Sequence, residues 1–286
     1  MTRRLYLASL FLIGLILAVP AAAAPAPPAD AIAGAAKWEI ENEKIPSIAI
    51  ALVDKGGVVW SGAWGFADAG RSQPAGPDTV YRAGSVSKLL TDTAIMRLVE
   101  AGKLDLDAPV TRYLPGFHPH NPFGGEITLR QLMTHRSGLV REPPRGHYFD
   151  ADAKGQDDTV LSLNDTTLVA KPGALTKYSN AGLAVVGEVL AAVTGKPYEQ
   201  ALNDSILAPL GMKASSMTLP PVRDRLAYSE MASFDGPRFP APPFDLGTPA
   251  AGNLYTTTGD LGRFAVAMLD HGQALLKPAT VEEMWR

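Results

Sequence analysis

A predicted β-hairpin followed by a long helical region is the feature that most limits the fold of this chain. The runs 47–53 and 58–64 are rich in Val, Ile, Ala and Trp, and they flank an Asp-Lys-Gly-Gly turn at 54–57. Glycine permits the left-handed backbone that tight hairpin turns need, so the two runs are predicted to pair as buried antiparallel strands. From residue 85 the apolar period becomes helical. The change of period predicts an α+β fold.

The helix that starts at Ser85 is predicted from apolar residues four positions apart, and Gly102 marks its end. Leu89 lies beside this stripe and is expected to widen it. The stripe consists of Val86, Leu90, Ala94 and Leu98. Further helices are predicted over 31–43, over 180–193, from Tyr198 to just before Pro209, from Asp260, and over the last residues to 286. Three segments are expected to be irregular: 118–125, 141–158 and the proline-rich 220–249.

The amino-acid composition of the chain excludes several kinds of functional site and binding partner. Hydrophobic residues make up 46% of the chain and charged residues 19%, which predicts a packed core rather than disorder. The formal net charge of -3 offers no general attraction to nucleic acid. The chain has no Cys, which excludes disulfides, a thiol nucleophile and Cys-ligated metals. Its five His show no metal-ligand spacing, so neither a metal nor another cofactor is expected.

The N-terminus has the order of a secretory signal peptide. Arg3 and Arg4 precede an apolar run over 5–19, and small residues follow, so 1–23 is predicted to be removed after Ala23. The alternative is an uncleaved membrane anchor, but the run is shorter than the about 20 apolar residues that a spanning helix needs. The mature protein is therefore expected to be exported, to the periplasm or the medium, with membrane contact only through an uncleaved N-terminus.

The residues that carry chemistry begin at Ser85. Lys88 lies three positions later, on the same face of the predicted helix, so the two side chains can meet. Taken alone, this spacing fits a helix-capping serine followed by an exposed lysine better than a catalytic pair. Tyr178 and Asn180 lie at the start of the helix predicted over 180–193 and point toward a shared cleft. A serine nucleophile needs a base and an acid, and Lys88 and Tyr178 are the available pair. Which of them is the initial base stays open, because their titrations are coupled.

With these motifs the chain resembles the serine hydrolases related to class C β-lactamases. This family includes β-lactamases, D-alanyl-D-alanine carboxypeptidases and penicillin-binding esterases. The resemblance covers about 31–286 and extends to three more segments in the family's order. They are Ile-Thr-Leu-Arg-Gln-Leu-Met-Thr-His-Arg-Ser-Gly-Leu at 127–139, Ala-Pro-Leu-Gly-Met at 208–212, and the Gly-Asn-Leu-Tyr-containing segment 250–264.

The resemblance implies a β-lactamase/transpeptidase-like fold, in which an antiparallel sheet flanked by helices joins a mostly helical part. The mature domain, 24–286, would divide into a sheet-side part, 31–84 with 250–286, and a mostly helical part, 85–249. The implied reaction is acyl-enzyme hydrolysis of amide, β-lactam or ester substrates, including peptidoglycan peptides, by a monomer.

The family's roles also carry over to individual residues. Ser85 would be the nucleophile, and its backbone N–H an oxyanion donor. Lys88 would be the base or would stabilise a Tyr178 phenolate, and Tyr178 would pass the proton to the leaving group. Asn180 would orient Lys88 and bind the substrate amide. The family's Thr-His-x-Ser-Gly segment places His135 in a structural turn, so catalysis by this histidine is not expected.

One family motif lacks a match. A late strand of the family carries Lys, His or Trp two positions before Gly, and here only His271-Gly272-Gln273 approaches it, in a predicted loop. The sheet is therefore expected to lack its C-terminal strands, as a fragment of a longer product or as a natural truncation with little stability or activity. A non-catalytic binder of cell-wall peptides or of a protein partner is the alternative function, although such a binder has no need of all four site residues.

Aromatic residues in the irregular segments have two possible uses. They either line the cleft or pack within their own loops. The residues concerned are Tyr148, Phe149, Phe234, Phe239 and Phe244.

Overall fold

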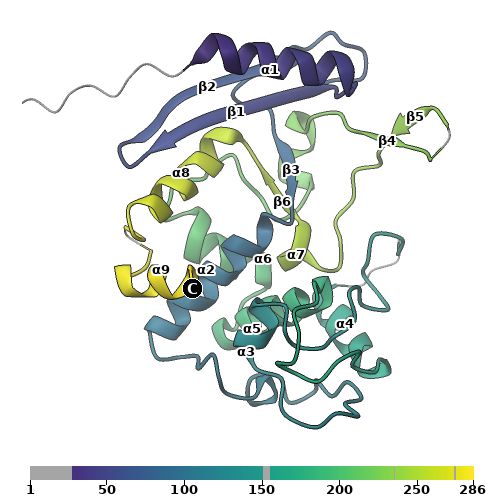
Figure 1. Ribbon diagram of the computed structural model, residues 1–286, viewed down its shortest axis with the longest axis vertical. Helices are drawn as coiled ribbons and strands as arrows, with labels where there is room; N and C mark the ends of the chain where they lie inside the picture. The colour runs from purple at the N-terminus through teal and green to yellow at the C-terminus, as the bar shows by residue number, and fades with distance from the viewer. Residues whose placement is uncertain (1–27, 151–154, 235, 274) are drawn as a thin grey trace, which may run out of the picture.

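The computed structural model describes residues 28–150, 155–234, 236–273 and 275–286 (Figure 1). The expected signal peptide, 1–23, lies outside the described residues. The helices are α1 (Ala29–Asn42), α2 (Ser87–Glu100), α3 (Leu129–Met133), α4 (Gln156–Leu161), α5 (Asn180–Thr194), α6 (Tyr198–Leu202), α7 (Pro249–Gly252), α8 (Thr258–Leu269) and α9 (Pro278–Met284). The strands are β1 (Ser47–Asp54), β2 (Gly57–Gly65), β3 (Tyr81–Gly84), β4 (Glu230–Ala232), β5 (Arg238–Pro240) and β6 (Leu254–Thr256).

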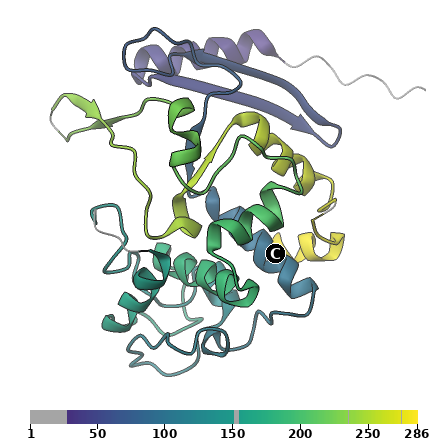
Figure 2. The same cartoon turned by 180° about the vertical axis from the view of Figure 1, so that it is seen from behind.

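The predicted hairpin is confirmed. β1 pairs antiparallel with β2, with Ser47 opposite Gly65 and Asp54 opposite Gly57. Helix α1 covers one face of this pair and α8 the other (Figures 1 and 2). A side chain at Gly262 of α8 would come within 2.7 Å of Val58, so glycine allows α8 to approach the strands closely.

The hairpin strands are half-buried rather than buried, which corrects the prediction. Val58 and Val59 of β2 are 41% and 49% exposed. Among the described residues, β1 and β2 pair only with each other. Because each face is covered by a single helix, the side chains near the edges and ends of the strands stay in contact with water.

A second strand pair positions the start of α2. β3 runs antiparallel to β6, with Tyr81 opposite Thr256 and Gly84 opposite Leu254. This pairing brings the segment just before Ser85 beside a segment about 170 residues later in the chain.

The third pair, β4 and β5, forms a short hairpin that projects from the body (Figure 1). The expectation that 220–249 is irregular holds only outside this hairpin and the 3-10 turn Pro220–Arg225.

The main hydrophobic core surrounds α5, which is buried over most of its length. The predicted end of this helix is confirmed, because Gly195 adopts the left-handed conformation (φ 67°) that closes a helix C-terminus. Gly187 brings α5 against α7, since a Cβ there would lie 2.6 Å from the Cβ of Ala250. Helices α2, α3 and α6 also contact α5.

Helix α2 follows the predicted apolar stripe with one exception. Leu90 and Ala94 are fully buried, and Gly102 adopts a left-handed φ of 68° after the helix ends. Leu89, however, is 54% exposed, so the prediction that it widens the stripe is wrong. One residue corresponds to about 100° around a helix, and this turn carries Leu89 out of the core.

The remaining expectations hold with small changes. Segment 118–125 has no helix, and the described residues 141–150 and 155 before α4 form no helix or strand. The helix at Tyr198 continues as the π-helical turn Asn203–Leu207 and ends before Pro209. No helix in the described part of the chain has the length and apolar character that crossing a bilayer requires.

The two neighbouring leucines of α2 offer a direct test of this packing. We expect Leu90→Ala to lower the free energy of unfolding by about 2–5 kcal/mol, because it leaves a cavity in the core. Leu89→Ala is the matched control, and we expect it to change stability by within about 0.5 kcal/mol. Urea denaturation followed by circular dichroism measures both values. Equal losses in the two variants would contradict this assignment of the buried face.

Candidate active site

Ser85 lies at the turn between β3 and α2. Gly84 has a left-handed φ of 54°, which a residue with a side chain adopts only with strain. The hydroxyl of Ser87 donates to the Gly84 carbonyl at 2.6 Å and accepts from the Leu254 amide at 2.9 Å, and so fixes the turn against β6. The Ser85 side chain is exposed, and its backbone N–H donates to no described residue. This N–H is therefore available to a ligand.

Lys88 is buried beside Ser85. Its Nζ donates to the Ser85 Oγ at 3.1 Å and to the Ala251 carbonyl of α7 at 2.7 Å. The same Nζ lies 4.9 Å from the centre of the Tyr178 ring. The side chain is only 6% exposed, so these oxygen and ring contacts replace water around the ammonium group.

Tyr178 is the third residue of the cluster around the Ser85 hydroxyl. Its hydroxyl lies 2.7 Å from the Ser85 Oγ, within hydrogen-bond distance. The guanidinium of Arg141 lies 5.1 Å from the centre of the Tyr178 ring. Burial opposes ionisation of this phenol, but polar contacts with Lys88 and Ser85 and the positive charges of Lys88 and Arg141 together lower the pKa of Tyr178. The site thus favours a phenolate more than water does.

His135 serves as a structural support for Tyr178. The two rings stack with their centres 4.4 Å apart, and the backbone of His135 has a left-handed φ of 59°. Its Nδ1 accepts from the Ser179 amide at 3.3 Å, and its carbonyl accepts from the Lys177 amide at 2.7 Å. Burial and the nearby Lys88 charge lower the pKa of His135. These contacts fit the structural turn that the sequence predicts.

Asn180 makes a different contact from the one expected. Its Nδ2 donates to the Glu142 carboxylate at 2.6 Å, and its Oδ1 is buried with no hydrogen-bond partner among the described residues. The Lys88 ammonium instead donates to oxygens of Ser85 and Ala251. A carboxylate is a stronger acceptor for an amide than a neutral oxygen, which accounts for the pairing with Glu142.

Arg141 and Glu142 are site residues that sequence reasoning missed. The Arg141 carbonyl accepts from the backbone amides of Asn180 and Ala181, at 2.8 and 3.1 Å, and so joins this loop to the start of α5. The Arg141 guanidinium pairs with Glu142 at 3.5 Å. The only signal in the sequence is that these charges follow the Ser-Gly-Leu motif after one intervening residue, Val140, and this signal did not predict contact with Tyr178.

Asp92 lies one helical turn after Lys88. Its Oδ1 is buried without a hydrogen-bond partner in the described structure. The rest of the side chain reaches a cavity of about 370 Å³, which Leu89 and Arg130 also line. Burial raises the pKa of Asp92 to about 8, although the Lys88 charge acts in the opposite direction.

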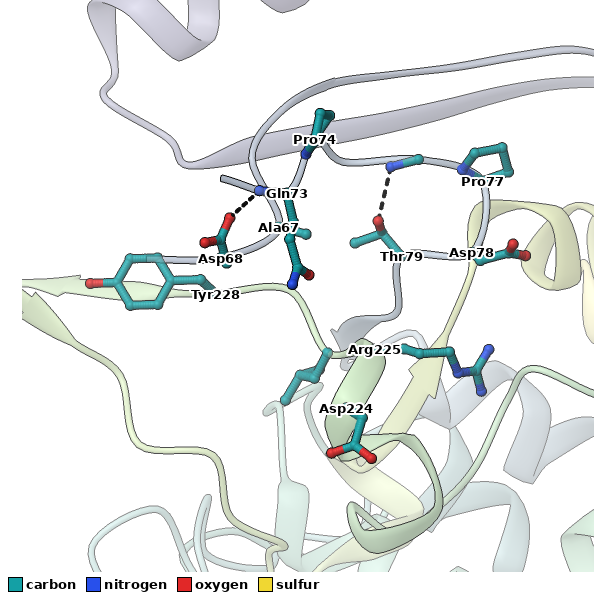
Figure 3. A pocket seen from close by; sticks show the side chains of 12 residues that line it. Ala67, Asp68, Gln73, Pro74, Pro77, Asp78, Thr79, Asp224, Arg225 and Tyr228 are labelled. Carbon is teal, nitrogen blue, oxygen red and sulfur yellow. Dashed lines mark hydrogen bonds between the residues drawn. The ribbon is translucent and has the colours of Figure 1, made fainter. Parts of the chain in front are cut away.

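A separate cavity of about 510 Å³ lies between the β2–β3 connection and the turn Pro220–Arg225 (Figure 3). The Asp68 carboxylate there accepts from the backbone amides of Ser72 and Gln73, and the Thr79 hydroxyl accepts from the Gly76 amide. Ser85, Lys88 and Tyr178 do not line this cavity, and the side-chain hydrogen bonds of Asp68 and Thr79 stay within the β2–β3 connection. It is therefore distinct from the serine site.

No cluster of three or more His, Cys, Asp or Glu that could hold a metal ion occurs in the described ranges. The His271-Gly272-Gln273 sequence lies in the turn between α8 and α9, and all three residues have positive φ. It is not on a strand, which agrees with the expectation from the sequence.

Comparisons with known proteins identify the family of the chain. A family model described as Beta-lactamase matches residues 30–286. Penicillin-binding protein 4 of Amycolatopsis lactamdurans is 33% identical over 207 residues, which cover 69% of this chain and 52% of that protein. Esterase EstB of Burkholderia gladioli is 36% identical over 179 residues, which cover 58% of this chain and 45% of that protein.

The structural comparison confirms the predicted α+β fold of β-lactamase/transpeptidase type. The octameric penicillin-binding protein homologue from Pyrococcus abyssi superposes with a TM-score of 0.81 at 27% identity, over 90% of this chain and 60% of that one. The chain spans about half the length of the curated relatives it matches, with 52%, 48% and 46% of the first three covered.

The raised pKa of Asp92 predicts a pH-dependent stability difference for Asp92→Asn. The unfolded carboxyl loses its proton near pH 4, whereas the folded one keeps it to about pH 8, so folding becomes less favourable as pH rises through this window. Asparagine has no such titration. We therefore expect the variant to gain stability relative to the parent from pH 4 to 8, and no further gain above pH 8.

Urea denaturation at several pH values measures this difference. Asp270→Asn is the control, because it replaces an exposed carboxyl at the end of α8. A pH-independent difference for Asp92→Asn would contradict the burial of this carboxyl.

Proposed function

The chain belongs to the β-lactamase family, and we propose that it is a serine hydrolase that forms an acyl-enzyme at Ser85. The observation that carries this proposal is the contact of one exposed hydroxyl with two candidate bases. The Ser85 Oγ lies 2.7 Å from the Tyr178 hydroxyl and 3.1 Å from the Lys88 Nζ. Both distances are within the reach that proton transfer requires. Substrates of this site are esters, amides or β-lactams, whose acyl carbon a serine can attack.

Tyr178 acts as the base in the acylation step. Its phenolate takes the Ser85 proton as the Oγ attacks the acyl carbon, and the carbonyl electron pair moves to the oxygen. The Ser85 N–H, which has no partner among the described residues, donates to that oxyanion. The lowered pKa of Tyr178 supports this assignment over Lys88 as the base. Lys88 keeps its proton and stabilises the phenolate.

The tetrahedral intermediate then collapses. The carbonyl re-forms, the bond to the leaving oxygen or nitrogen breaks, and Tyr178 returns its proton to the leaving group. In the second half of the reaction Tyr178 takes a proton from water, whose oxygen attacks the acyl carbon. The Ser85 oxygen leaves with that proton, which releases the acid and restores the free hydroxyl. Atoms and charge balance over the cycle, with no metal or cofactor needed.

Asn180 is proposed to bind the substrate. One N–H of its Nδ2 donates to Glu142, and the second N–H is free to donate to a substrate carbonyl. The Glu142 bond holds the amide in place, so it lowers the entropy that substrate binding would otherwise cost.

The place of action is also a proposal. A signal peptide over 1–23 would export the protein to the periplasm or the medium, where small molecules and peptidoglycan peptides are available as substrates. A monomer stays a prediction for this chain, whereas the Pyrococcus abyssi neighbour is octameric.

Loss of the nucleophile tests the proposed function. In the full-length gene product, we expect Ser85→Ala to lower p-nitrophenyl acetate hydrolysis by about 10⁴-fold or more and to abolish labelling by a fluorescent penicillin. Ser61→Ala is the matched control, because Ser61 is an exposed serine of β2. Labelling that persists in Ser85→Ala would rule out the nucleophile. A folded parent protein that is neither labelled nor hydrolytic would favour the non-catalytic binder.

Arg141 provides a test of the base. If the Tyr178 phenolate accepts the proton, kcat/KM falls as pH drops through the pKa of Tyr178. Arg141→Gln removes one of the charges that lower this pKa, so we expect the acidic limb of the pH profile to move to higher pH. The shift should shrink in high salt, because the Arg141 side chain is 65% exposed.

Arg145→Gln is the matched control for this measurement. Its side chain is 55% exposed and pairs with Asp158. An equal shift in both variants, or no shift in Arg141→Gln, would contradict Tyr178 as the base.

A further inference from the structure

An apolar cavity of about 700 Å³ lies between β3, β6 and the segment 226–244. The sequence left two uses open for five aromatic residues, and the structure brings four of them to this cavity: Tyr148, Phe149, Phe239 and Phe244. Phe234 does not line it. These residues come from two separate irregular segments, so their convergence is a property of the fold and not of local sequence.

Arg82 connects the cavity with the surroundings of the nucleophile. Arg82, which lines the cavity, precedes Ser85 by three residues, about 10 Å along an extended strand. The Arg82 Nε donates to the Gly252 carbonyl at 3.1 Å, and the carbonyl of the preceding residue, Ala251, accepts from Lys88. A substituent of moderate length on a substrate bound at Ser85 can therefore reach the aromatic rings.

Three hydrogen bonds hold the Arg82 guanidinium in the wall of the cavity. Its guanidinium donates to the carbonyls of Gly252 and Phe244 and to the Asn253 side chain, at 2.9–3.1 Å. It also lies 5.5–5.9 Å from the ring centres of Tyr148, Phe244 and Tyr255. Because the guanidinium is held against these rings, most of the cavity lining is aromatic or aliphatic, which suits an uncharged apolar group.

The geometry also indicates which half of a substrate enters. The leaving group must face Tyr178 to receive its proton, and Tyr178 is surrounded by His135, Arg141 and Lys88. Tyr178, His135 and Arg141 do not line the cavity, which is built from β3, β6 and 226–244. We therefore assign the acyl group, which does not need to reach Tyr178, to the aromatic cavity.

Exposed apolar side chains at the cavity mouth are consistent with this use. Phe149 is 92% exposed, Met231 47% and Phe239 45%. Apolar surface gathered around a concavity typically marks a binding site rather than ordinary protein surface. An apolar acyl chain would cover these side chains as it binds.

We propose that this cavity is the acyl pocket of the enzyme and that it takes medium-chain alkyl or aryl acyl groups of ester substrates. The inference rests on the proposed function, because it uses Ser85 as the nucleophile and Tyr178 as the leaving-group acid. It extends that function by naming the substrate class. Short acyl groups leave the cavity empty, whereas an octanoyl or phenylacetyl group reaches the rings.

A series of p-nitrophenyl esters from acetyl to octanoyl tests the pocket in the full-length gene product. Because a buried methylene contributes about 0.8 kcal/mol, we expect kcat/KM to rise about two- to fourfold per methylene until the cavity is filled. Ala241→Phe places a ring in the cavity, and we expect it to lower the octanoyl/acetyl ratio of kcat/KM by about tenfold or more.

Two phenylalanines of equal exposure form the matched pair. Phe239 lines the cavity and is 45% exposed, and Phe123 lies elsewhere and is 46% exposed. We expect Phe239→Ala to lower the octanoyl/acetyl ratio about fivefold and Phe123→Ala to leave it unchanged. A ratio that falls equally in both variants would overturn the proposal. So would a preference that follows the length of the alcohol instead of the acyl group.

Binding of octanoate to Ser85→Ala, measured by calorimetry, separates this inference from the proposed function. If octanoate binds more tightly than acetate and Ala241→Phe removes the difference, the pocket is supported even in a protein without hydrolytic activity. If acetyl esters are hydrolysed through Ser85 but octanoate binds no better than acetate, the proposed function stands and the acyl pocket is refuted.

Discussion

The buried ammonium of Lys88 is the constraint on which the site depends. A cation removed from water needs nearby acceptors, because an uncompensated buried charge costs several kcal/mol. Here the Ser85 hydroxyl and the Ala251 carbonyl supply them, with the Tyr178 ring alongside. The three groups belong to different parts of the chain, so the site forms only when α2, α7 and the start of α5 are packed together. Gly187 allows that packing, because any side chain there would collide with Ala250 of α7.

Local sequence patterns predicted the helices and strands better than they predicted the contacts between side chains. The hairpin, the helix after Ser85 and the left-handed Gly195 follow from turn chemistry and periodicity, which depend on residues close in sequence. The sequence also predicted the cluster of Ser85, Lys88 and Tyr178, because these residues lie in motifs that resemble those of the family. The contact between Arg141 and Tyr178 could not be predicted, since it depends on how one irregular segment packs against another.

The residues proposed for catalysis and those proposed for substrate specificity lie in different kinds of segment. The reacting groups lie at the ends of core elements: Ser85 just before α2, Tyr178 just before α5, and Ala251 in the buried α7. The aromatic cavity is built largely from Tyr148, Phe149 and the segment 226–244, which lie in loops apart from the short strands β4 and β5. Substitutions in such loops cost little core packing, so they can alter the acyl pocket without moving the nucleophile.

The protonation of Asp92 influences how the Lys88 charge is used. An ionised carboxylate one turn from Lys88 would add a negative charge, which opposes the effect of the Lys88 charge on the pKa of Tyr178. Burial raises the pKa of Asp92 to about 8, so below that pH the carboxyl is mostly neutral. The Lys88 charge then stabilises the Tyr178 phenolate without an opposing negative charge from Asp92. The energetic cost of burying an acid in α2 thereby favours the ionised state that the proposed base requires.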